Sequence, residues 1–190
     1  MSPHRSASPV EHLVIVDGHL HDVVDRVRDL DLAGTTDVVL DTIGSTTVDP
    51  FVVASAVAQA TDRVRITVAV PVTEWHPYLI ARRLAAVDKI ADGRLRWWPV
   101  DADATRRAES ADIVAALLTS WPADVVLNDR ASGIQVDTDR VTRVMVQGNH
   151  FTVDSPLDVP RGPQGVVPHL DPFDGFGVAD PPATATSGTR

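Results

Sequence analysis

Short apolar, β-branched runs alternate regularly along this chain with longer segments of helical periodicity, and this alternation limits the folds that it can adopt. Four runs have the character of buried strands: LVIV at 13–16, DVVLD at 37–41, RITVAV at 65–70 and LRWWPV at 95–100. Between the first two, apolar residues recur at helical spacing, as in Val23, Val24, Val27 and Leu30. Strands that alternate with helices predict right-handed crossovers and a parallel sheet, with functional groups at the carboxyl ends of the strands.

Two helix starts are marked by a polar residue followed by proline. Asp49 precedes Pro50, and His76 precedes Pro77. A side-chain acceptor before the helix can bind free backbone N–H groups, and proline at the first helical position loses no hydrogen bond. We expect helices over 51–61, over 77–90 and, from a further apolar face, over 105–121.

The second half of the chain has a different pattern. From Asp124 to Val153, short β-branched pieces alternate with Asn, Asp, Ser and Gly, which predicts an inserted hairpin or a small antiparallel lobe. Residues 171–190 contain Gly, Pro, Ser and Thr without periodicity, which predicts a flexible tail. We therefore expect an N-terminal extension over 1–12, one domain over 13–170 with an insertion at about 122–165, and the tail.

Charge and composition exclude several classes of partner. The formal net charge is -9, from 26 acidic and 17 basic residues, so the protein should repel phosphate backbones and anionic membranes. Neither a nucleic-acid partner nor a membrane partner is expected. Cysteine is absent and no apolar run reaches about 18 residues, which favours a cytoplasmic protein.

Two long motifs resemble one protein family. The run HPYLIARRLAAVDKIADGRLRWW at 76–98 resembles the HP…AR…A.LD.LSGGR pattern of bacterial luciferase-like flavin monooxygenases. The run DRASGIQVDTDRVTRVMVQGNHFTVDSPLDVPRGPQG at 129–165 resembles the inserted segment of the nitrilotriacetate and dibenzothiophene-sulfone monooxygenase branch. Upstream, AGTTDVVLD and VDPFVVASAVAQATDRVRI resemble the second strand and following helix of the same family. The resemblance covers most of 32–165, in the family's order.

The resemblance implies a fold and an activity. The family folds as a (β/α)8 barrel and uses reduced FMN, supplied by a separate reductase, to activate dioxygen for attack on a small organic substrate. A complete barrel needs roughly 250 residues, so we expect a truncated, partial TIM-barrel-like α/β fold with about four to five parallel strands and the antiparallel insertion. A homodimer mate or a full-length homologous subunit could then close the barrel.

The resemblance also implies cofactor-binding positions at the carboxyl rim. The expected residues are Asp41, Thr73, His76, Trp98 and Asp101. No catalytic residue is assigned.

The fourth strand departs from the family pattern. It reads RWW followed by Asp101 where the family has GWN and a Thr/Ser pair, so a carboxylate and indoles would crowd or repel a flavin. Trp97 and Trp98 should alternate faces, with the inward indole filling flavin space. After Gly165, no Gly-Ser phosphate-binding turn leading into a helix is recognisable. The alternative is therefore a catalytically degenerate flavin-binding or subunit-like protein.

A third interpretation is a metal-dependent hydrolase. His19 and His21, in DGHLHD, resemble the H-x-H opening of amidohydrolase barrels, in which imidazoles bind zinc. That chemistry requires further ligands at later strand ends. His76, His150 and His169 do not fall at such ends, so the sequence favours loop residues at a helix start.

Overall fold

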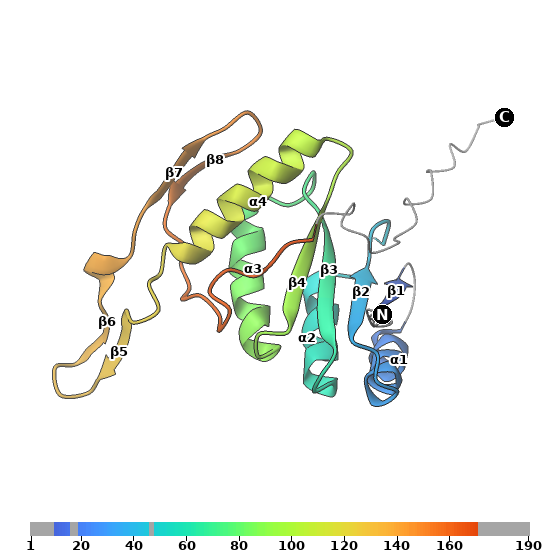
Figure 1. Ribbon diagram of the computed structural model, residues 1–190. Helices are drawn as coiled ribbons and strands as arrows, with labels where there is room; N and C mark the ends of the chain where they lie inside the picture. Colours follow the sequence, from blue (N-terminus) through green and yellow to red (C-terminus); the bar gives the residue numbers. More distant parts are fainter. Residues whose placement is uncertain (1–9, 16–18, 46–47, 171–190) are drawn as a thin grey trace, which may run out of the picture.

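The computed structural model describes residues 10–15, 19–45 and 48–170. Its centre is a parallel sheet in the order β1-β2-β3-β4 (Figure 1). The strands are β1 (Val10–Val14), β2 (Asp37–Asp41), β3 (Arg65–Pro71) and β4 (Leu95–Val100). The helices that follow them are α1 (Leu20–Leu32), α2 (Pro50–Ala60), α3 (Pro77–Ile90) and α4 (Ala104–Thr119). The predicted α/β alternation is confirmed.

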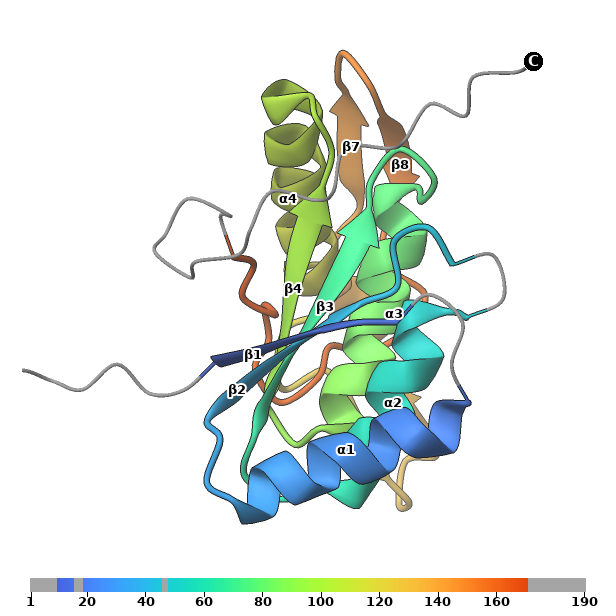
Figure 2. The same cartoon turned by 90° about the vertical axis from the view of Figure 1, so that its right-hand side faces the viewer.

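All the helices cover one face of this sheet. In Figure 1 the strands and helices run in the same order across the molecule, and each helix contacts the next one along the chain. Alternate strand residues, such as Leu40, Val68 and Trp97, belong to the main core beneath the helices, while Val39 and Ala69 point to the other face. A sheet wound in sequence order with helices on one face is a segment of barrel wall, as Figure 2 also shows.

The two predicted helix starts are confirmed in atomic detail. The Asp49 carboxylate accepts a hydrogen bond from the Phe51 N–H at 2.9 Å. The His76 Nδ1 accepts one from the Tyr78 N–H at 3.2 Å. In both helices proline occupies the first turn, so the sequence signal and the cap coincide.

The first strand begins earlier than predicted. β1 starts at Val10, and Val10 to Val14 pair in parallel register with Asp37 to Asp41. The expected start at Leu13 is therefore wrong, and residues 10–12 belong to the sheet. β1 is also not the buried strand expected, because it lies at the edge and 57% of Val14 is exposed. The predicted last residue, Val16, and the tail over 171–190 lie outside the described residues.

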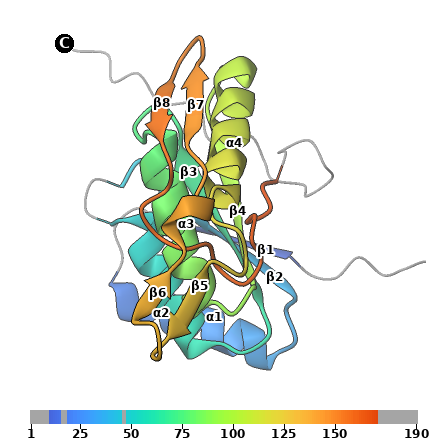
Figure 3. The ribbon, with the colours of Figure 1, turned by 90° about the vertical axis from the view of Figure 1, so that its left-hand side faces the viewer.

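The insertion forms two separate antiparallel hairpins. One pairs β5 (Val126–Asp129) with β6 (Ile134–Val136); the other pairs β7 (Val144–Gln147) with β8 (Thr152–Ser155). A short 3₁₀ helix, η1 (Thr138–Arg140), lies between them. Figure 3 shows both hairpins on the outer side of α3 and α4. The predicted antiparallel lobe is confirmed, as two small sheets rather than one.

The β7–β8 turn is tied to α4 by one carboxylate. Glu109 accepts backbone N–H groups of Asn149, His150 and Phe151 at 2.9–3.2 Å. Burial alone would raise the pKa of Glu109, but these N–H groups lower it below its usual value. A side chain at Gly148 would collide with the same carboxylate.

The segment after the insertion returns to the sheet through a buried contact. Asp88 of α3 is fully buried and accepts hydrogen bonds from the Gln164 N–H at 3.0 Å and Nε2 at 2.7 Å. The chain then reaches the outer edge of β4, where Trp97 donates to the Pro168 carbonyl and Leu170 donates to the Trp97 carbonyl. This is the position of a fifth parallel strand.

Within the described ranges, no helix is both long and apolar enough to cross a membrane.

Candidate functional site

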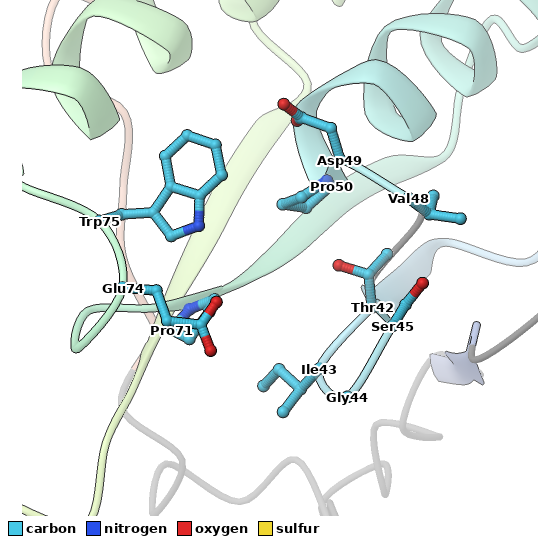
Figure 4. A pocket seen from close by; sticks show the side chains of 10 residues that line it. All are labelled: Thr42, Ile43, Gly44, Ser45, Val48, Asp49, Pro50, Pro71, Glu74 and Trp75. Carbon is cyan, nitrogen blue, oxygen red and sulfur yellow. The ribbon is translucent and has the colours of Figure 1, made fainter.

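A pocket of about 600 Å³ opens at the carboxyl ends of β2 and β3. That volume is typical of a small-molecule site, and the position matches the functional end of parallel strands. The residues that line it come from the β2–α2 and β3–α3 connections (Figure 4): Thr42, Ile43, Gly44, Ser45, Val48, Asp49, Pro50, Pro71, Glu74 and Trp75.

One wall of this rim pocket is an aromatic side chain held in place by a cation. The Arg83 guanidinium lies 4.4 Å from the Trp75 ring centroid and also forms an ion pair with Asp49. The Phe51 ring meets Trp75 edge-on, with centroids 5.7 Å apart. In Figure 4 the Trp75 indole points into the pocket. Because Arg83 and Phe51 restrain Trp75, and Asp49 in turn holds Arg83, the indole offers a fixed aromatic surface to a ligand.

A second cluster lies on the helix-free face of the sheet, where Val39 and Ala69 pack with Trp98. The buried Asp41 carboxylate accepts the Ile43 N–H at 2.9 Å and lies 3.1 Å from His12 Nε2. The imidazole of His12 meets the Trp98 indole edge-on at 6.4 Å. Sequence reasoning missed His12 because it placed residues 1–12 outside the sheet. Extending the strand alternation two residues back from Val14 would have placed His12 on this face.

The structure brings only part of the predicted set together. Asp41 and Trp98 share the second cluster through His12. Thr73 is exposed and does not line the rim pocket, while His76 is exposed and packs edge-on against Phe151 at 5.9 Å. Both therefore lie at the rim without facing the pocket.

The loop after β4 does not present a free carboxylate. Asp101 accepts hydrogen bonds from Arg106 Nη1 at 2.8 Å and from the Asp103 N–H at 2.9 Å. Its charge is thus matched by Arg106 in the first turn of α4. The predicted alternation of the two indoles is confirmed, since Trp97 belongs to the helix-side core and only Trp98 faces inward.

The helix-free face of the sheet carries an ion-pair network at the amino-terminal ends of the strands. Asp37 accepts hydrogen bonds from Arg65 at 2.6 and 2.7 Å, and Arg96 lies 3.3 Å away. Burial would raise the pKa of Asp37, but the bonds from Arg65 and Thr36 and the charge of Arg96 lower it below its usual value. In barrels this end of the strands contributes to stability rather than chemistry.

The metal interpretation finds no ligand set in the described part of the chain. His19 and His21 are exposed at the start of α1, and no group of three or more His, Asp, Glu or Cys side chains converges there or elsewhere in the described ranges. Asp17, which lies between β1 and these histidines, is outside those ranges.

A parallel sheet wound in order, helices on one face and a pocket at the carboxyl rim define the class: an α/β protein built on part of a (β/α)8 barrel. Residues 2–181 match the family model of the luciferase-like monooxygenases. The chain belongs to that family.

Curated relatives support the branch expected from the motifs. The chain is 30% identical over 141 residues to dibenzothiophene-sulfone monooxygenase of Rhodococcus erythropolis, covering 64% of this chain and 31% of the relative. It is 29% identical over 136 residues to nitrilotriacetate monooxygenase component A of Aminobacter aminovorans, covering 62% and 30%. It is 30% identical over 151 residues to a subunit of the pristinamycin IIA synthase of Streptomyces pristinaespiralis, covering 75% and 54%. The matches span between about a third and about half of these relatives.

Solved structures confirm the fold. A long-chain alkane monooxygenase superposes with a TM-score of 0.73 at 18% identity, covering 87% of this chain and 52% of that chain. The oxygenating constituent of 3,6-diketocamphane monooxygenase from Pseudomonas putida, in complex with FMN, superposes with a TM-score of 0.59 at 11% identity, covering 83% and 49%. The predicted partial barrel is confirmed, because the chain corresponds to about half of each structure.

Proposed function

We propose that this chain supplies the flavin-ring site of a luciferase-like monooxygenase that acts on a small organic substrate. The observation that carries the proposal is the rim pocket, which lies at the carboxyl ends of β2 and β3 in a chain of this family. Reduced FMN would come from a separate reductase. When bound, the reduced flavin supplies the electrons that activate dioxygen.

The residues present fit a flavin ring better than a flavin phosphate. Trp75 gives a restrained aromatic wall, and the backbone of Gly44 leaves open space beside the pocket. Thr42 and Ser45 add hydroxyl groups that can meet the polar edge of a ring. These residues would bind and orient the ring, while Ile43 and Pro71 would exclude water from one side.

The segment in which the family carries its phosphate-binding turn has no such turn between Gly165 and Leu170. From Gly165 to Leu170 the chain runs along β4 without a helix start, and a phosphate normally binds at a helix N-terminus or a nest of N–H groups. We therefore propose that this chain recognises the ring and contributes little to phosphate binding.

A second candidate function keeps the fold and omits the chemistry. The chain spans about half or less of these curated relatives, and one of them is itself a synthase subunit by name. A subunit-like protein would bind flavin, or close onto a second copy or a full-length homologue, without oxygenating a substrate. The half-exposed β1 edge gives such a partner a place to add strands.

A flavin titration tests the proposal. Purified protein is titrated into oxidised FMN while flavin fluorescence is followed, and binding of reduced FMN is measured by equilibrium dialysis under anaerobic conditions. We expect saturable quenching in the wild type, and a dissociation constant at least tenfold higher in Trp75→Leu. Trp121→Phe is the matched control, because Trp121 lies away from the pocket and its indole N–H is bound by the Leu157 carbonyl. Equal affinity in the Trp75→Leu variant and the wild type would refute the pocket assignment.

A further inference from the structure

Glu74 is an ionisable side chain of the rim pocket that the proposed flavin contacts leave unused. It lies on the β3–α3 connection, it is exposed, and in Figure 4 its carboxylate extends into the pocket. Within the described part of the chain, its carboxylate takes part in no ion pair or hydrogen bond. An unpaired charge in a concave site selects among ligands by their charge.

The lining of the pocket is acidic. It contains two carboxylates, Asp49 and Glu74, and none of its described lining residues is Lys, Arg or His. The Arg83 guanidinium stacks on the Trp75 ring and forms its ion pair with Asp49, so it neutralises that carboxylate rather than Glu74. One negative charge therefore stays unmatched in the pocket, and Glu74 carries it.

The rest of the lining suits the apolar body of an organic molecule. Ile43, Pro71 and Trp75 offer apolar surface, and Trp75 directly follows Glu74 in the chain. A ligand packed against this surface would place a polar end near the Glu74 carboxylate. An ammonium group there gains a charge-assisted hydrogen bond, whereas a second carboxylate there is repelled.

We propose that the substrate of this site is a positively charged organic molecule, such as an amine, and that Glu74 is its counter-ion. This inference rests on the proposed function, because it names the class of substrate that enters the pocket beside the flavin ring. It also excludes polycarboxylate substrates, since a polyanion finds no cationic side chain in the described lining.

Three small aromatic probes test the charge preference. Benzylamine, benzyl alcohol and benzoate carry a positive, a neutral and a negative group on one phenyl ring. Each is titrated at neutral pH into ¹⁵N-labelled protein, with and without saturating FMN, while the Trp75 indole N–H signal is followed. That signal is the one of four tryptophan indole signals that is missing from Trp75→Phe.

We expect benzylamine to bind most tightly and benzoate most weakly. The expected advantage of benzylamine over benzyl alcohol is about fivefold, or about 1 kcal/mol, as for two unit charges about 4 Å apart in water. High salt should reduce this advantage, because the pair is exposed to solvent.

Variants of Glu74 test whether this carboxylate is responsible. Glu74→Gln keeps nearly the same shape and should bring benzylamine to within about twofold of benzyl alcohol. Glu74→Lys should reverse the order, so that benzoate binds more tightly than benzylamine. Asp112→Asn removes a charge from the exposed face of α4, and as the matched control it should keep the wild-type order.

The outcomes separate the two proposals. Equal binding of benzylamine and benzoate, no shift with any probe at millimolar concentration, or a wild-type preference in Glu74→Gln overturns the substrate class. If the flavin titration still shows quenching that weakens in Trp75→Leu, the proposed function stands. If benzylamine binds with the expected preference and FMN does not bind, the proposed function fails while the pocket keeps its preference for cations.

Discussion

The contact between Asp88 and Gln164 joins the two sequence motifs that carry the family resemblance. Asp88 lies in the VDKIADGR run of α3, and Gln164 lies in the PRGPQG run that follows the insertion. The carboxylate is fully buried and accepts both the backbone and the side-chain N–H groups of Gln164. Replacing it with an amide, Asp88→Asn, keeps the shape and removes the charge.

The expected loss of stability follows from the donors left behind. The two N–H groups bind different oxygens of the carboxylate, and asparagine places an NH2 donor where one of these oxygens was, so one of the two bonds is lost. Gln164 could turn its amide over to recover the second bond, but its Nε2 would then lose the Leu95 carbonyl at 2.8 Å. One buried donor or acceptor stays unpaired in either arrangement, which costs about 1–3 kcal/mol. Because the charge of Asp88 is lost as well, we expect the free energy of unfolding to fall by about 2 kcal/mol.

Urea unfolding followed by circular dichroism measures this value. Asp112→Asn on the exposed face of α4 is the matched control and should lie within about 0.5 kcal/mol of the wild type. Gly162→Ala should also destabilise, because a methyl group there would collide with the Asp88 carboxylate. If Asp88→Asn costs less than about 0.5 kcal/mol, these motifs do not hold the returning segment on the sheet.

Four further outcomes follow from the same structure. The folded-state pKa of Asp37 is lowered, so its bond to Arg65 stabilises the protein above about pH 4 and is lost as the pH falls through the folded-state pKa. In Asp37→Asn, the free energy of unfolding measured in urea should therefore fall less between about pH 5 and pH 2 than it does in the wild type. Arg83→Met should free Trp75 and weaken flavin binding severalfold in the fluorescence titration, with circular dichroism unchanged. Glu109→Ala should speed hydrogen exchange at residues 149–151, and equal rates would show that the Glu109 carboxylate does not hold the β7–β8 turn on α4. If a second copy closes the barrel, light scattering should give an oligomer at micromolar concentration, and a folded monomer would exclude that closure.

The layout of the sheet could be predicted because its signals are local. Runs such as DVVLD and RITVAV are buried on both faces, and Asp49–Pro50 and His76–Pro77 place the following helices to within a residue. The start of β1 could not be found in this way, because an edge strand is only half buried and its sequence, VEHLV, carries a weak apolar signal.

The candidate site was harder to predict because it depends on contacts between distant residues. The family resemblance implies Asp41 and Trp98, yet His12, which joins them, falls in the expected N-terminal extension. Trp75 carries no motif of its own, and its role depends on a cation from the neighbouring helix. Asp101 was expected to repel a cofactor, but a sequence cannot show that Arg106 occupies its carboxylate.

A comparison of riboflavin with FMN tests whether this chain recognises the flavin ring independently of the phosphate. The two ligands share one ring and differ only in the phosphate, so their dissociation constants separate ring recognition from phosphate recognition. We predict saturable binding of both ligands to the wild-type protein, with dissociation constants within about threefold of each other, a difference of less than about 1 kcal/mol. Binding of FMN a hundredfold tighter than riboflavin, or binding of neither, would contradict it.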